Sequence, residues 1–326
     1  MKSGWGAYAA FLAVLVALSF VMPSAQDNYF ARIAMGAGVA VTLAVSLNIV
    51  NGFTGQFSIG HAGFMAIGAY LAAAWAAWCH AHNPLGLLDV PMGRHLLFAG
   101  ALLMGGLIAA AAGFVVGLPS LRLRGDYLAI ATLGFGEIIR VLLENADSLG
   151  GSRGFSMPPS AISADLLWIW GIAATTILVA ARLKHSTEGR AMLAVREDEV
   201  AAEAMGVNTT KEKVRAFVMA AFFAGVAGAL FAHLELYLNP KSFTFMRSIE
   251  VVAMVVLGGL GSITGAVLAA IVLSVLPEAL RPVQNLTGYD LRLVIYGLLL
   301  IVVPMKRPAG LFGSGELRLF KKAVPS

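Results

Sequence analysis

FARIAMGAGVAVTLAVSLNIV, residues 30–50, is an apolar run whose single charged side chain is Arg32. An α-helix rises 1.5 Å per residue, so a run of this length spans the roughly 30 Å hydrocarbon core of a bilayer. Similar runs recur along the chain, which is typical of a protein that crosses a membrane several times. They cover residues 7–22, 57–78, 96–118, 127–143, 166–183, 214–236 and 291–303.

The overall composition supports this interpretation. Of the 326 residues, 59% are hydrophobic and 13% are charged, whereas soluble domains carry about 45–50% apolar and about 25% charged residues. An ordinary soluble enzyme and a disordered chain are both excluded. We expect one all-α transmembrane domain over residues 1–326, a helical bundle of about 8–10 membrane segments, some of them broken or re-entrant.

Two segments leave alternatives open. Residues 7–22 could belong to a cleaved signal peptide, but cleavage after Ala25 would put Pro23 where a small residue is required, which favours a retained anchor helix. Residues 249–276 are apolar but contain Gly258, Gly259 and Gly261. They form either one broken span or two half-helices that re-enter the membrane.

The chain lacks the sequence features of an ATPase or a metalloenzyme. It has no G-x-x-x-x-G-K-[ST] phosphate loop and no H-E-x-x-H motif, and its one cysteine, Cys79, excludes an internal disulfide. We therefore expect neither a catalytic residue nor a metal or other cofactor. Any ATP hydrolysis would belong to another subunit.

Positive charge predicts the orientation. With the N-terminus inside, fifteen of the 23 lysines and arginines fall in inner segments and seven in outer ones. Because cytoplasmic loops are enriched in these residues, both termini, including the tail 306–326, are predicted to be cytoplasmic. The net charge of +5 is explained in the same way, without nucleic acid.

The longest hydrophilic stretch between apolar runs, residues 184–213, would then be cytoplasmic. Residues 191–205 have apolar side chains at helical spacing, Gly206 suits the end of a helix, and Thr209 and Glu212 form a T-x-x-E capping box. A short helix, a turn and a new transmembrane helix are predicted. The short helix could lie on lipid headgroups or dock into a cytoplasmic partner.

Polar, glycine-rich sequence interrupts the apolar runs near residue 50. Such sequence is tolerated at membrane depth only where it is buried in protein or lines a wet cavity, although a tight turn at the cytoplasmic surface is an equal alternative. His61 alone is better explained as a hydrogen-bonded structural residue. The candidate pathway residues are Asn48, Gly52, Gln56, Ser58, Gly60, His61, Glu137, Gly258, Gly259 and Gly261.

Glu137 and Arg140 lie inside the run 127–143. Each charge costs about 2.5–3.5 kcal/mol near the centre of an inserted helix. At a spacing of i, i+3 the two can form an ion pair, which reduces this cost. A structural pair is favoured, and a role in the path of a zwitterionic solute stays open.

Several long motifs resemble one family. They are LNIVNGFTGQFSIGHAGF at 47–64, LRLRGDYLAIATLGFGEIIR at 121–140, the loop from GRA at 189 through REDE at 196 to AMGVN at 204–208, VLGGLGS at 256–262 and RPAGLFG at 307–313. Together they resemble the branched-chain amino-acid ABC transporter permeases of the M type, over most of the chain from about residue 30.

The resemblance implies a bacterial inner-membrane importer subunit that carries branched-chain or related amino acids. Its implied partners are a homologous H-type permease, two cytoplasmic ABC ATPases and a periplasmic solute-binding protein. It makes 191–206 a coupling helix, although Val200 interrupts the usual Glu-Ala-Ala pattern, which leaves the role of Glu199 open. The implied coupling residues are Arg190, Arg196, Glu197, Asp198, Glu199, Glu203 and Gly206.

Two other functions remain alternatives. A urea or short-amide ABC permease shares these motifs. An ion-coupled secondary transporter would need buried carboxylates, and Glu137 is the only acidic residue well inside a predicted span.

Overall fold

The computed structural model describes residues 29–120, 125–158 and 164–281, with the short pieces 297–298, 301–302, 305–307, 310–311 and 313. The predicted segment 7–22, and most of 291–303 and of the tail 306–326, lie outside the described residues.

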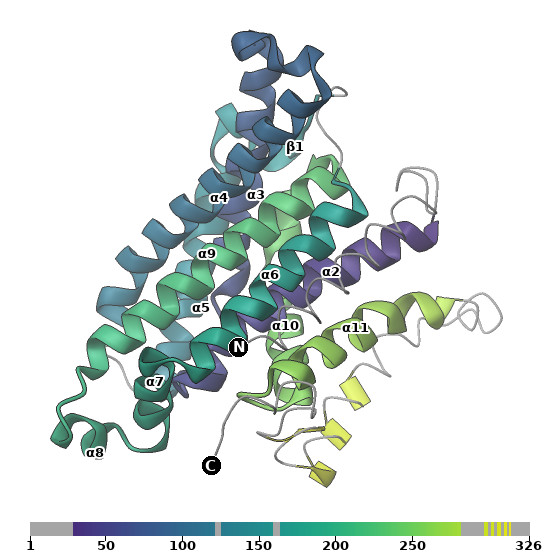
Figure 1. Ribbon diagram of the computed structural model, residues 1–326. Coiled ribbons are helices and arrows are strands. Elements are labelled where there is room, and N and C mark those ends of the chain that lie inside the picture. The colour runs from purple at the N-terminus through teal and green to yellow at the C-terminus, as the bar shows by residue number, and fades with distance from the viewer. Residues whose placement is uncertain are drawn as a thin grey trace. The chain divides into compact units, whose positions relative to one another are not determined.

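The described chain is almost entirely helical, which confirms the predicted fold class (Figure 1). Its α-helices are α2 (Tyr29–Asn48), α3 (His61–His82), α4 (Pro91–Ser120), α5 (Asp126–Glu144), α6 (Leu166–His185), α7 (Thr187–Glu197), α8 (Glu199–Ala204), α9 (Thr209–Glu235), α10 (Phe245–Gly258) and α11 (Ile263–Ala279). The shorter elements are the π-helix η1 (Ile49–Phe53), the 3-10 helices η2 (Pro84–Asp89), η3 (Asp147–Leu149), η4 (Gly151–Arg153) and η5 (Pro240–Phe243), and the antiparallel strands β1 (Phe155–Ser156) and β2 (Tyr237–Leu238).

Five helices of the described part are long and apolar enough to cross a membrane. They are Tyr29–Phe53, His61–His82, Pro91–Pro119, Leu166–His185 and Thr209–Glu235. The predicted segment 127–143 also forms a helix, α5, but its charged side chains set it apart from these five. A polytopic helical membrane protein is thus confirmed.

The helices fall into two compact units. The second unit, residues 49–164 and 183–250, is built on the close packing of α3, α4 and α9. A Cβ at Gly68 of α3 would lie 2.0 Å from the carbonyl oxygen of Gly225 in α9, and one at Gly228 would lie 1.9 Å from that of Met65. These helices touch backbone to backbone, as small residues allow in membrane proteins.

The first unit contains residues 29–48, 165–182 and the described chain from 251. Here α2 packs against α11. The predicted interruption of 249–276 is confirmed: α10 ends at Gly258, and α11 begins at Ile263. Gly259 and Gly261 have φ of +110° and +84°, a backbone region that glycine adopts without steric cost.

Candidate functional site

The polar stretch after α2 is buried and mostly non-helical. The chain passes from α2 into the π-helix η1, and then runs without regular structure until α3 begins at His61. Asn51, Gln56, Ser58 and His61 are all less than a tenth exposed. The predicted break in the helix is therefore present, and its polar groups lie inside the protein.

Hydrogen bonds within this stretch are incomplete. Ser58 N donates to Asn51 Oδ1 at 3.2 Å, and Thr54 Oγ1 donates to the Val50 carbonyl at 2.7 Å. Asn51 Nδ2 and Gln56 Oε1 are buried without a hydrogen-bond partner among the described residues. Each such orphaned group costs about 1–3 kcal/mol, so this arrangement is less stable than one that satisfies both.

The end of the stretch is fitted against α5 and α10. Ile59 N donates to Thr132 Oγ1 at 3.1 Å, and Ala62 N donates to Ser248 Oγ at 2.9 Å. A Cβ at Gly60 would lie only 2.3 Å from the carbonyl oxygen of Thr132. Any side chain at position 60 must therefore displace α5, and glycine is required for this close approach.

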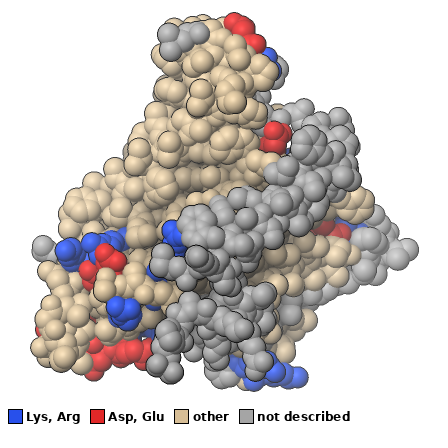
Figure 2. Space-filling view, viewed as in Figure 1, with Lys and Arg blue, Asp and Glu red and all other residues tan. Residues whose placement is uncertain are grey.

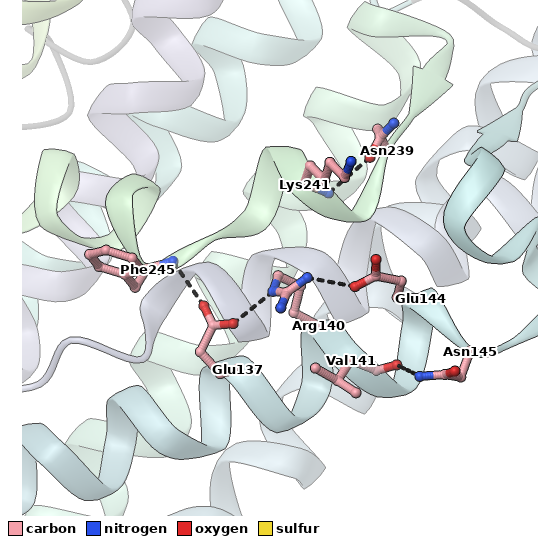
Figure 3. Close-up of polar contacts among 8 residues, drawn as sticks. All are labelled: Glu137, Arg140, Val141, Glu144, Asn145, Asn239, Lys241 and Phe245. Carbon is pink, nitrogen blue, oxygen red and sulfur yellow. Dashed lines mark hydrogen bonds and ion pairs between the residues drawn. The ribbon is translucent and has the colours of Figure 1, made fainter.

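An ion network occupies the C-terminal half of α5 (Figure 3). Arg140 Nε lies 2.7 Å from Glu137 Oε2, and Arg140 Nη1 lies 2.6 Å from Glu144 Oε2. The other oxygen of Glu137 accepts a hydrogen bond from the backbone N–H of Phe245, at the start of α10. The predicted Glu137–Arg140 pair is confirmed. Glu137 comes eleven residues after Asp126, the first residue of α5, so it lies roughly 16 Å along the helix.

The same network includes a residue that sequence reasoning missed. Glu144 follows Arg140 at i+4, a spacing that itself indicates an ion pair, but it lies just beyond the predicted span. With two carboxylates and one guanidinium, the three side chains carry one net negative charge. These side chains are between a fifth and a third exposed, so the network is only partly shielded from its surroundings by the protein.

In the other unit, Asn48 fixes the break between α10 and α11. Its Oδ1 accepts from Gly261 N at 2.9 Å, and its Nδ2 donates to the Ser262 carbonyl at 3.1 Å. Asn48 is fully buried. A Cβ at Gly258 would lie 2.4 Å from the Gly265 carbonyl oxygen, so α10 and α11 also contact each other closely beside the two Asn48 hydrogen bonds.

The predicted single helix over 191–205 is wrong. Two short helices, α7 and α8, meet at Asp198, which is extended (φ −156°) and whose carboxylate accepts hydrogen bonds from Val200 N and Ala201 N. Aspartate is a strong N-cap residue, and here it starts a new helix. The predicted common apolar face is split as a result: Met192 and Val195 are buried, whereas Met205 is 85% exposed.

The next helix begins as predicted, with a different cap. Gly206 follows α8 with φ +85°, as expected. The predicted capping box at Thr209 and Glu212 does not form: Asn208 is the N-cap, and its side chain accepts from Lys211 N at 3.0 Å.

The charged residues of the 184–213 loop are largely bound to the protein itself. Glu199 Oε1 lies 2.6 Å from Lys213 Nζ, and Glu203 Oε1 accepts from Thr209 Oγ1 at 2.7 Å. Arg190 is exposed and reaches the His185 carbonyl at 3.3 Å. Arg196 donates to the carbonyl of Gly52 in η1 at 2.9 Å and pairs with Glu197. The sequence analysis did not single out Lys213. Its ion pair with Glu199 gives Glu199 a structural role, in joining α8 to α9.

The outer surface of this loop combines charge with exposed apolar side chains. Val200, in α8, is 67% exposed, and Met205, directly after α8, is 85% exposed. Figure 2 shows charged side chains gathered over α7 and α8, whereas the visible surface along α4 is almost free of them.

Comparison with known proteins gives the family. The family described as "Branched-chain amino acid transport system / permease component" matches residues 29–304. The chain belongs to this family. The permease is similar to the "High-affinity branched-chain amino acid transport system permease protein LivM" of Salmonella typhimurium, at 35% identity over 92% of this chain and 74% of that protein, and to LivM of Escherichia coli K12, at 36% over the same shares.

A more distant relative is LivH of Escherichia coli K12, at 27% identity over 89% of the permease and 96% of LivH. No solved structure shows significant similarity. The resemblance drawn from the motifs is confirmed: this is the permease component of a branched-chain amino acid ABC transport system, a transport subunit and not an enzyme.

Proposed function

We propose that this permease carries branched-chain or related amino acids across a bacterial inner membrane as one of two homologous membrane subunits. Its companions would be an H-type permease, two cytoplasmic ATPases and a periplasmic binding protein that delivers the solute. Similarity to both LivM and LivH supports a pair of related permeases.

The 184–213 loop carries this proposal. It presents two short helices whose outer surface exposes Val200 and Met205 beside the exposed carboxylate of Glu197. An apolar tip rimmed by charge suits a cleft in a partner protein. The excess of lysine and arginine in the segments placed inside supports a cytoplasmic loop and cytoplasmic termini.

Side-chain contacts also join the loop to α9, so that a movement of the loop would be passed on to this helix. Glu199 ties α8 to Lys213 of α9, and Glu203 ties α8 to Thr209. We assign ATPase docking to the exposed Val200 and Met205, and also to Arg190, Glu197 and Gly206 elsewhere on the surface of the loop. Asp198, Glu199 and Glu203 then hold the shape of the loop.

For the solute path, we propose the polar stretch from η1 to α3 together with Glu137 of α5. The buried Asn51, Gln56 and Ser58 offer polar groups between apolar helices, and Glu137 adds a half-buried charge near mid-helix. In the other unit, we propose Asn48, Gly258, Gly259 and Gly261 as separate candidate pathway residues, because they form a break between two helices, as transporters use at their solute sites.

The test is uptake by the full complex in proteoliposomes. We expect labelled leucine to accumulate only when ATP and the binding protein are both present. Accumulation of urea and not leucine would favour the short-amide alternative. Accumulation by this subunit alone, driven by an ion gradient, would replace the proposal with a secondary transporter.

A further inference from the structure

Arg196 lies at the end of α7 but is directed into the protein. Its Nη1 donates to the Gly52 carbonyl at 2.9 Å, across 144 positions of sequence. Its side chain is 27% exposed, compared with 71% for the neighbouring Glu197, which accepts from Arg196 Nη2 at 2.6 Å. A guanidinium held in this way cannot be the main contact for an outside partner.

The aliphatic part of Arg196 covers the same turn. Gly55 has φ +68°, and a Cβ there would lie 2.8 Å from Arg196 Cγ. Arg196 therefore touches the turn at two points, a charge-assisted hydrogen bond at Gly52 and close packing at Gly55. Charge-assisted bonds are the stronger kind, and a π-helical turn is often a functional site in a helix.

From this turn, a series of hydrogen bonds and close contacts continues to α5. Asn51 binds Ser58 N, Ile59 N binds Thr132 Oγ1, and Gly60 packs against the Thr132 carbonyl. Thr132 lies on α5, five residues before Glu137. Contacts between residues distant in sequence thus connect α7, through η1 and residues 54–60, to α5.

The connecting stretch contains two buried polar groups that a shift of the chain could pair. Asn51 Nδ2 and Gln56 Oε1 are buried without partners among the residues described. Leaving such groups unpaired is unfavourable, so a shift of this stretch that pairs them would recover about 1–3 kcal/mol for each group. A two-state element biased from one end is what long-range coupling requires.

We propose that Arg196 is a positioning residue for transport: it fastens α7 to the Gly52–Gly55 turn, so that movement of α7 shifts residues 54–60 and, through Thr132, α5. This assignment rests on the proposed docking of ATPases at the 184–213 loop. It separates docking, at exposed side chains such as Met205 and Glu197, from transmission, through the inward-directed side chain of Arg196.

The experiment uses the complete transporter in proteoliposomes and measures leucine uptake per ATP hydrolysed. For Arg196→Ala we expect the ATPases to co-purify and to hydrolyse ATP, with uptake per ATP lowered by at least about fivefold, the lower end of typical coupling effects. Arg196→Lys keeps a donor for the Gly52 carbonyl and should recover part of the ratio. Lys211→Ala, an exposed basic residue of the same loop, should leave the ratio unchanged.

A second variant tests the other end of the connection. Thr132→Val removes the acceptor for Ile59 N and should lower the same ratio, and the double variant should be no worse than the more severe single one. Full coupling in Arg196→Ala, or independent additive effects of the two substitutions, would overturn the proposal. Absence of ATP-dependent uptake by the wild-type complex would refute the proposed function instead.

Should Arg196→Ala fail to assemble, Gly55→Ala displaces the Arg196 side chain while keeping its charge. Uptake per ATP within about twofold of wild type in that variant would equally contradict the assignment, because typical coupling effects exceed this factor.

Discussion

The ammonium of Lys213 lies 2.6 Å from the carboxylate of Glu199, and this ion pair ties α8 to the first turns of α9. The Lys213 side chain is only 7% exposed, compared with 26% for Glu199. A charge so well buried depends on its partner.

Replacing Glu199 with alanine should therefore loosen the loop. Because Lys213 would be left buried and unpaired, we expect a loss of about 1–3 kcal/mol of stability. Thermal unfolding in detergent and limited proteolysis within 184–213 measure this. Glu188→Ala is the control, since that carboxylate is 47% exposed and lies 3.7 Å from Arg215; an equal loss in both variants would contradict the special role of the pair.

Asn48 should be among the most sensitive positions of the first unit. Asn48→Ala removes both side-chain hydrogen bonds to the Gly261–Ser262 turn, each worth about 0.5–1.5 kcal/mol net. We expect a lower melting temperature, while Asn145→Ala, at the exposed end of α5, changes little. Equal melting temperatures for the two variants would show that the Asn48 hydrogen bonds do not stabilise the protein.

Gly60→Ala should impair transport without preventing assembly. The added Cβ would meet the Thr132 carbonyl at 2.3 Å, so α5 must move and the proposed path must change shape. Gly134→Ala on α5 is the matched control, because a Cβ there has nothing within 4 Å. If uptake survives in Gly60→Ala as it does in the control, this close approach is not part of the path.

Neutralising Glu137 and Arg140 together separates a structural ion pair from a pathway role. The double change to glutamine leaves Glu144 as the one charge of the network, at the end of α5 and 30% exposed, so insertion should be preserved. We expect uptake to fall by about tenfold, or roughly 1.4 kcal/mol in the barrier. The control is the same double change at Arg247 and Glu250, which pair at 2.9 Å on α10. Unimpaired uptake would make the α5 pair structural only.

Local sequence patterns predicted the helices well. Hydropathy located both ends of α2, α4, α6 and α9 to within five residues, because a membrane span needs a long apolar run whatever it packs against. Gly259 and Gly261 likewise marked the break between α10 and α11, since a positive φ is a local property.

Contacts between distant segments could not be predicted in this way. Nothing near Asn48 indicates that it binds Gly261, and nothing near Arg196 indicates Gly52, because these partners depend on how helices pack. The division at Asp198 was missed for another reason: apolar spacing continued across it, and a capping aspartate reads as an ordinary polar position of a helix.

The central claim, that a partner on the cytoplasmic side engages the 184–213 loop, is tested most directly by labelling Met205→Cys in a Cys79→Ala background. We predict reaction with a membrane-impermeant maleimide in inside-out vesicles, none in right-side-out vesicles, and protection when the ATPases are bound. Labelling from the periplasmic side only, or labelling that bound ATPases leave unchanged, would contradict the account.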